Sequence, residues 1–210
     1  VTLNPAELRH AKYQGEFKWT VRNKAHSWSV LWEKYQVVRV RERVRMQDDS
    51  LMAELFGVIL KGVTDGGQSR INRLYDGYDK SFDPADESVR RVDDVLEYIL
   101  TNLADYLLGT PVLSAPHFLM LFAAVAHARH GIPGGDMGER MPARDESALS
   151  DINNARENVL EVASVLSSDR PVPKYEDFWT ATQKSTQRIS SRRIRFPVFS
   201  RLSPSADPRW

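Results

Sequence analysis

The chain has 210 residues, of which 41% are hydrophobic and 27% are charged, a balance typical of a globular protein rather than of a disordered one. Its 29 lysines and arginines face 28 acidic residues, and a net charge of +1 excludes a globally basic nucleic-acid binder but not a local basic patch. The absence of cysteine excludes disulfides, thiolate metal sites and cysteine nucleophiles.

No segment has the length and character of a membrane helix or a signal peptide. The longest apolar run covers residues 118–126, whereas a membrane helix needs about 20 apolar residues. The first residues carry neither the basic region nor the apolar region of a signal peptide. These features, together with the lack of cysteine, predict a cytoplasmic protein without membrane contact.

The N-terminal part is predicted to be helical. Residues 4–7 (Asn-Pro-Ala-Glu) are a strong helix start, because Asn accepts bonds from free amides, Pro suits the first position and Glu favours the positive end of the helix. This helix is expected to end near Tyr13, before Gly15. A second helix follows Gly15, and the spacing of aromatic and apolar residues over 27–38 predicts a third.

Residues 37–46 fit two structures. Valine alternates with Arg39, Arg41, Arg43 and Arg45, which fits a half-buried strand, while the four-residue spacing of the same arginines fits a helix surface. We favour helix or irregular structure because the neighbouring segments are helical. The arginines are interpreted mainly as a solvated face paired with nearby acids, and secondarily as a stripe that contacts phosphates.

The remaining segments complete an all-α fold, an irregular multi-helix bundle of about eight or nine helices. Helices are predicted over residues 51–63, 71–78, 83–107, 115–130, 145–166 and 175–194. The segment 115–130 is the most apolar and is expected to be central. The glycine-rich segment 131–144 is predicted to be a flexible or substrate-facing loop. We expect one helical domain over residues 1–202 and a Pro/Ser tail over 203–210.

Two short motifs suggest chemistry but lack its context. Residues 65–70 (Asp-Gly-Gly-Gln-Ser-Arg) are glycine-rich, yet they lack the Lys and Ser/Thr of a Walker loop and follow a helix, so an interhelical loop is favoured. His127 and His130 lie three residues apart without a matching carboxylate, and a favourable position at a helix C-terminus explains them better than a metal does. No metal site and no cofactor are therefore predicted in this chain.

A dense group of cations near the C-terminus is the main candidate for nucleic-acid binding. Its members are Lys184, Arg188, Arg192, Arg193 and Arg195. Few acids lie nearby, and Phe196 and Phe199 interleave with the cations, which suits either base stacking or packing. Contact with DNA and docking on an acidic partner both stay open at this point.

Several short motifs occur in an order that resembles a known family. They are Leu3-Asn4-Pro5-Ala6-Glu7-Leu8-Arg9-His10-Ala11 with Gly15-Glu16-Phe17, then Arg45-Met46-x-Asp48-Asp49, then Ile71-Asn72-x-Leu74-Tyr75-x-x-Tyr78-Asp79, and a closing helix with Phe178 and Arg188. Together they resemble domain-of-unknown-function family 262, the family of the N-terminal domain of GmrSD-type restriction endonucleases. The resemblance covers most of the chain.

The resemblance implies that this chain is the helical C-terminal part of a larger family domain. The ParB/sulfiredoxin-like N-terminal part of that domain is associated with nucleotide hydrolysis or nuclease activity, so catalysis and any nucleotide would belong to the parent protein. The implied role is in restriction and antiviral defence, with the upstream N-terminal half and DNA as candidate partners. The chain is also a candidate for oligomerisation.

The resemblance also singles out Asn4, Glu7 and Arg9. These residues would directly follow the catalytic part, so they are candidates for lining its cleft, where Arg can stabilise phosphate charge. Equally, Glu7 and Arg9 would pin the helical part to the N-terminal part by a salt bridge. The alternative function for the whole chain is a protein-interaction scaffold with no nucleic-acid contact of its own. An enzyme that uses His127 and His130 is the least favoured interpretation.

Overall fold

The computed structural model describes residues 2–201, and every regular element within them is helical, which confirms the predicted all-α fold. The described α-helices are α1 (Pro5–Lys12), α2 (Glu16–Ser27), α3 (Ser29–Glu33), α4 (Val40–Arg43), α5 (Gln47–Lys61), α6 (Gln68–Tyr78), α7 (Ala85–Asn102), α8 (Ala115–His130), α9 (Ile152–Leu166), α10 (Glu176–Gln183) and α11 (Ile189–Ser200). Three 3₁₀ turns accompany them: η1 (Pro111–Leu113), η2 (Gly138–Arg140) and η3 (Pro173–Tyr175). The tail predicted over residues 203–210 lies outside the described residues.

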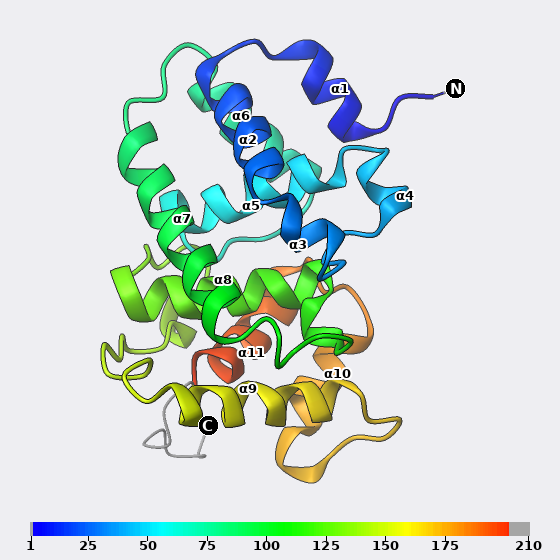
Figure 1. The fold of residues 1–210 in the computed structure, drawn as a ribbon, viewed down its shortest axis with the longest axis vertical. Helices are drawn as coiled ribbons and strands as arrows, with labels where there is room; N and C mark the ends of the chain where they lie inside the picture. The colour runs from blue at the N-terminus through cyan, green and yellow to red at the C-terminus, as the bar shows by residue number, and fades with distance from the viewer. Residues whose placement is uncertain (1, 202–210) are drawn as a thin grey trace.

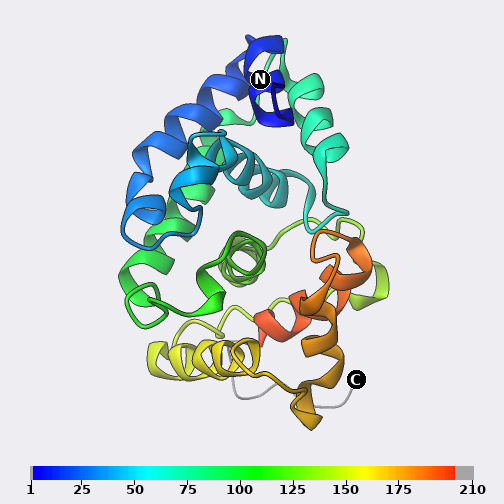
Figure 2. The same cartoon turned by 90° about the vertical axis from the view of Figure 1, so that its right-hand side faces the viewer.

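Helix α8 lies at the centre of the molecule, as its sequence predicts. Every residue from His117 to Ala128 is buried, because this helix is apolar on all its faces and can only be stable inside. Figure 1 shows α1–α6 on one side of α8 and α9–α11 on the other, and Figure 2 views α8 nearly along its axis with the other helices around it. The fold thus consists of two groups of helices, α1–α6 and α9–α11, that pack on opposite sides of the central helix α8.

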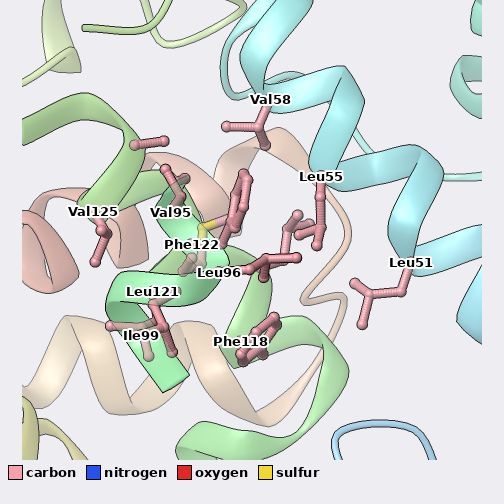
Figure 3. Packing of buried hydrophobic residues seen from close by; sticks show 14 of the residues in the cluster. Leu51, Leu55, Val58, Val95, Leu96, Ile99, Phe118, Leu121, Phe122 and Val125 are labelled. Carbon is pink, nitrogen blue, oxygen red and sulfur yellow. The ribbon is translucent and has the colours of Figure 1, made fainter. Parts of the chain in front are cut away.

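Helices α5 and α7 pack on the central helix α8 on the side where the N-terminal helices lie. Figure 3 shows one cluster of buried side chains that includes Leu51, Leu55 and Val58 of α5, Val95, Leu96 and Ile99 of α7, and Phe118, Leu121, Phe122 and Val125 of α8. All of these side chains are buried. Truncating a fully buried leucine or phenylalanine to alanine at such a site costs about 2–5 kcal/mol, so this contact is a main source of stability.

An aromatic cluster joins α2 to α6 on the far side of α5. The ring of Phe17 lies edge-on to Tyr75, Phe82 and Phe56, with centroid distances of 5.1, 5.1 and 6.0 Å. Edge-to-face pairs at these distances are favourable beyond their buried area. The cluster therefore fixes the angle at which the N-terminal helices lie on α5.

The segment from 27 to 46 differs from its prediction. The helix predicted over 27–38 is broken at Trp28, and α3 has only five residues before Gln36 adopts a left-handed backbone with φ of +53°. Residues 37–46, whose pattern fits both a strand and a helix, contain the four-residue helix α4. Val37 and Val38 are buried in a bend between α3 and α4, so the chain changes direction there instead of continuing as one helix.

Three further boundaries also moved. Helix α5 begins at Gln47 rather than at residue 51, because Met46 takes a left-handed conformation (φ +57°) immediately before it. Helix α7 ends at Asn102 rather than near 107, where turns take over. Helix α9 begins at Ile152 rather than at 145, because the Asp151 carboxylate accepts from the amides of Asn153 and Asn154 and caps it there.

The single helix predicted over 175–194 is in fact two. Helix α10 ends at Gln183, the turn 184–188 follows with Ser185 at φ +53°, and α11 continues to Ser200. The start of α11 is fixed from far away in sequence, because the amide of Ile189 donates to Asp65 Oδ1 at 2.7 Å. A cap from a loop 124 residues upstream leaves no local signal in the sequence.

Candidate functional sites

Asn4 and Glu7 form a helix cap and an anchor. Asn4 Oδ1 accepts from the amides of Ala6 and Glu7 at 2.8 and 3.0 Å, and Glu7 Oε2 accepts from the Asn4 amide at 2.7 Å. This is a capping box, which satisfies backbone donors at the start of α1. Glu7 Oε1 also lies 2.9 Å from Arg45 Nε, and Asn4 Nδ2 donates to the Arg45 carbonyl at 2.9 Å. Both residues therefore tie α1 to the segment before α5.

Arg9 is buried, and its hydrogen-bond acceptors are all neutral. Its Nη2 donates to Ser50 Oγ at 2.7 Å, and its Nη1 donates to Asn72 Oδ1 at 3.3 Å and to the side chain of Gln68. The guanidinium also lies 5.7 Å from the ring centre of Tyr75. Burial lowers the pKa of Arg9, and its interaction with Tyr75 partly offsets this effect. Arg9 thus joins α1 to both α5 and α6.

A small cavity lies beside Arg9. Its volume is about 10 Å³, and its polar lining includes Lys18, Asp49 and Ser50. A cavity of this size holds about one water molecule. Burial raises the pKa of Asp49, whose carboxylate lies 3.1 Å from Arg22 Nη1. Of the three candidate cleft residues, only Arg9 borders this cavity, since Glu7 faces Arg45 instead.

The segments that carry the family resemblance meet in space at this end of the molecule. Asn4 contacts Arg45, 41 residues away in sequence, and Arg9 contacts Asn72, 63 residues away, while Glu7 also contacts Arg45. Farther along, the amide of Gly15 donates to Asp79 Oδ1 at 2.8 Å. A Cβ atom on Gly15 would lie 2.0 Å from the Asp79 carbonyl oxygen, so only glycine fits there.

The C-terminal cations do not form one surface. Arg192 is buried, and its guanidinium donates to Glu54 Oε1 at 2.8 Å and to the Thr64 carbonyl at 3.0 Å. Arg195 is fully buried, with 0% of its surface exposed. Neither guanidinium is accessible to a phosphate in this structure. Arg192 and Arg195, two of the five residues predicted to bind DNA, therefore stabilise the interior of the fold instead.

Arg195 has no carboxylate partner. Its donors reach the carbonyls of Thr186 at 2.9 Å and Pro116 at 2.6 Å, and its Nη2 lies 2.9 Å from His117 Nδ1. A guanidinium only donates, so Nδ1 must accept and the imidazole carries its proton on Nε2. Burial, together with the charge of Arg195, lowers the pKa of His117 to about 3. This contact joins α11 to the start of α8.

Lys184, Arg188 and Arg193 remain at the surface. Lys184 and Arg188 are in the turn before α11, and 71% of the Arg188 side chain is exposed, with Nη1 3.8 Å from Asp65 Oδ2. Arg193 Nε and Nη2 donate to the Asp136 carbonyl at 2.9 and 2.6 Å. A carbonyl does not neutralise a cation, so Arg193 keeps its positive field at this face.

The segment 65–70, predicted as an interhelical loop, is a loop only over residues 65–67, because α6 begins at Gln68. Asp65 caps α11, and its own amide donates to Asp136 Oδ2 at 2.8 Å. The amide of Gly66 donates to the Gln187 carbonyl at 2.8 Å. The carboxylate of Asp65 thus occupies the position at the start of α11 that an anion would otherwise take.

The segment 131–144 is held down rather than free. Asp136 accepts from Arg70 Nη2 at 2.9 Å, and its amide donates to the Val63 carbonyl at 2.9 Å. At the other end, Arg144 donates to the carbonyls of Ala128 and Arg129. A Cβ on Gly135 would lie 2.3 Å from the Val63 oxygen, so the backbones here are in close contact. The segment predicted to be a flexible loop is instead held in place by these contacts between α5 and α11, and we call it the strap at 131–144.

His127 and His130 do not face a common point. His127 Nε2 lies 3.1 Å from the Pro142 carbonyl, whereas His130 Nε2 lies 2.7 Å from Asp94 Oδ2, which Arg129 also binds. Burial lowers the pKa of His127. Within residues 2–201, no cluster of three or more potential metal-binding side chains is present.

The arginines of 39–45 divide into two pairs. Arg43 contacts Glu33 at 3.3 Å, and Arg45 contacts Glu7, in agreement with the solvated, acid-paired interpretation. Arg39 and Arg41 are exposed and form no ion pair within the described part of the chain. They are the free cations of this segment.

Reasoning from the sequence missed the residues that accept hydrogen bonds from the buried arginines. The acceptors around Arg9 are ordinary polar residues with no motif of their own: Gln68, Ser50 and Asn72. For α11 a signal did exist. Arg192, Arg195, Phe196 and Phe199 follow the spacing of a buried helix face, so both arginines occupy core-facing positions.

None of the helices formed by residues 2–201 has both the length and the apolar character to cross a membrane. No family model, no curated protein and no solved structure matches the chain. The resemblance to domain-of-unknown-function family 262 therefore stays a prediction that depends on the quoted motifs.

Proposed function

We propose that this chain is the helical accessory part of a restriction-type defence protein, as the family resemblance implies. In this role it supports an upstream nucleotide-dependent or nuclease part and does not catalyse a reaction itself. The observation that carries the proposal is the contact between the motif segments. Asn4, Glu7 and Arg9 bind the segments at Arg45 and Asn72, so residues that define the resemblance also build one structural unit.

The accessory role also agrees with how the polar residues are used. Asn4 and Glu7 cap and anchor α1, and the cavity at Arg9 has room for about one water molecule rather than for a substrate. A catalytic centre needs a site of ligand size with convergent polar groups. The candidate residues of this chain are engaged in holding helices together.

The proposed DNA contact involves Lys184, Arg188 and Arg193, the exposed members of the C-terminal set. They lie on one turn and the first part of α11, which places their charges within a short stretch of surface. Such cations would contact phosphates and contribute affinity without sequence preference. The burial of Arg192 and Arg195 makes this surface smaller than the sequence suggests, and the alternative function is a scaffold without DNA contact.

Salt-dependent binding to a labelled DNA duplex, measured by fluorescence anisotropy, separates these two functions. We expect binding at low salt that weakens as salt rises. The variant K184A/R188A should lower the slope of log affinity against log salt by about two, since each lost phosphate contact contributes about 0.9. The variant R73A/K80A removes two exposed cations elsewhere and should leave the slope unchanged.

Absence of binding at low salt would overturn the DNA contact and leave the scaffold. An unchanged slope in K184A/R188A would mean that DNA binds at another surface. Arg192 and Arg195 are unsuitable for this test, because their loss would disturb the fold.

A further inference from the structure

Helix α4 presents an apolar surface that nothing in the described chain covers. Val40 and Val44 are 71% and 76% exposed, more than any other large apolar side chain of residues 2–201. They are four residues apart, so they lie on the same side of the helical turn. Arg39 and Arg41 flank them and are exposed, and their guanidinium groups form no ion pair among the described residues, while the carboxylate of Glu42 accepts from the Arg39 amide at 2.8 Å. We call Arg39, Val40, Arg41 and Val44 the α4 ridge.

The α4 ridge is held in place at its base. Arg43 is bound to Glu33, and Arg45 to Glu7 and to the Thr2 carbonyl. Two of the four arginines in residues 39–45, Arg43 and Arg45, therefore anchor the segment, and the other two, Arg39 and Arg41, lie beside the exposed valines. Exposed apolar residues framed by charge are typical of an interaction surface.

A complementary hollow lies between the end of α2 and the middle of α7. Its volume is about 470 Å³, and it is lined by Lys24, Ser27, Trp28, Asp93, Asp94 and Glu97. We call it the α2–α7 hollow. It is a shallow depression that is largely open to solvent, so it suits contact with a few side chains of a partner surface rather than enclosure of a ligand. The half-buried indole of Trp28 is fixed there, because its Nε1 donates to Asp93 Oδ1 at 2.9 Å.

The charges of the α2–α7 hollow leave one carboxylate without a cation. Asp93 is paired with Lys24, and Asp94 with Arg129 and His130. Glu97 is exposed and accepts only from the Thr101 hydroxyl, at 3.3 Å. The hollow thus offers an aromatic side chain next to a carboxylate without an ion pair, and the α4 ridge offers valines next to two guanidinium groups without an ion pair.

We propose that the α4 ridge of one copy of this chain binds in the α2–α7 hollow of a second copy. Val40 and Val44 would pack on Trp28, and Arg41 or Arg39 would pair with Glu97. A net charge of +1 means that two copies do not repel each other strongly at long range.

The ridge and the hollow are different surfaces, and Figure 1 shows α4 and α7 on opposite sides of the molecule. Each copy can therefore use one surface as donor and the other as acceptor. Such a head-to-tail contact produces a ring or an open chain of copies. The contact uses none of the cations proposed for DNA, so K184A/R188A should associate like the unaltered chain, and either proposal can fail alone.

Sedimentation equilibrium of the full chain across micromolar to submillimolar concentration tests the contact. We expect the average mass to rise above that of one copy. The ridge variant V40S/V44S and the hollow variant E97R should each weaken association by about tenfold or more, as loss of an interface anchor does. The matched variants L108S and E157R, at exposed positions elsewhere, should associate normally.

A mixture of the two weakened variants gives the sharpest result. The intact ridge of E97R can bind the intact hollow of V40S/V44S, while the reverse contact is damaged on both sides. We therefore expect a species of two copies that does not grow further. A single-copy mass for the unaltered chain at all concentrations, or association that neither variant weakens, would overturn the proposal. So would a mixture that stays at one copy, because it would indicate a symmetric contact.

Discussion

The first and the last of the described helices, α1 and α11, each contain a buried arginine without a carboxylate partner, but these arginines lie at different places in the fold. Arg9 ties the edge helix α1 to neutral side chains of α5 and α6. Arg195 binds the carbonyls of Thr186 and Pro116 and the imidazole of His117, at the start of the central helix α8. Arginine thus holds the peripheral helix α1 in place at Arg9 and stabilises the central helix α8 at Arg195.

This difference decides what the loss of each residue should do. Burying a guanidinium carries a desolvation cost of several kcal/mol, which hydrogen bonds must offset. At Arg9 the acceptors are side chains that can reorient if the arginine is removed. At Arg195 two acceptors are backbone carbonyls inside the protein, which would lose their partners.

The largest effect is expected from Arg195→Ala. The change leaves a cavity and two orphaned carbonyls beside α8, and it should lower the free energy of unfolding by about 3–4 kcal/mol. Urea denaturation followed by circular dichroism measures this. Arg195→Met is the matched control, since it fills most of the volume and removes the buried charge, and its cost should be clearly smaller. A cost below about 1 kcal/mol for Arg195→Ala would contradict an anchoring role.

A smaller and local effect is expected from Arg9→Ala. Loss of its three hydrogen bonds should cost about 2 kcal/mol, mostly as opening of α1. Hydrogen exchange with mass spectrometry should therefore show lost protection in α1 and unchanged protection in α8. The neighbour Leu8, which is 53% exposed, provides the control Leu8→Ala, expected within about 0.5 kcal/mol of the unaltered chain. Equal loss of protection in α1 and α8 would remove the distinction between the two arginines.

The same comparison shows what the sequence predicts well. Residues 4–7 identified the start of α1 because a capping box is a local pattern. The sequence of residues 115–130 identified the central helix because a helix that is apolar on every face is stable only when it is buried in the core. Where the signal lies within a few residues, the structure follows it.

The errors came from contacts between distant segments. The split between α10 and α11 depends on Asp65, and the strap at 131–144 depends on Val63 and Arg193, none of which is close in sequence. The density of cations near the C-terminus suggested a surface, but whether an arginine is buried depends on the carbonyls that the fold brings to it. For Arg192 and Arg195 the spacing with Phe196 and Phe199 was the better guide.

The smallest predicted effect concerns pH and further separates the two arginines. Among these hydrogen-bond partners, only His117 beside Arg195 is a residue whose ordinary pKa lies near neutral pH, since Ser50, Asn72 and Gln68 do not titrate there. The pKa of His117 is about 3 in the folded chain against an ordinary value of 6.5. Between these values the unfolded chain binds the extra proton, so stability is fully present above pH 6.5 and falls as the pH drops.

This linkage predicts that His117 lowers the free energy of unfolding by about 1 kcal/mol between pH 7 and pH 5.5. His117→Asn tests the prediction, because its side-chain oxygen can accept from Arg195 as Nδ1 does, but it does not titrate. Urea denaturation of both proteins at the two pH values isolates the contribution, since His127 and the carboxylates are common to both. Parallel pH profiles would mean that His117 is protonated as easily in the folded chain as in the unfolded one. In that case the contact between Arg195 Nη2 and His117 Nδ1 could not persist, because a protonated imidazole has no acceptor to offer.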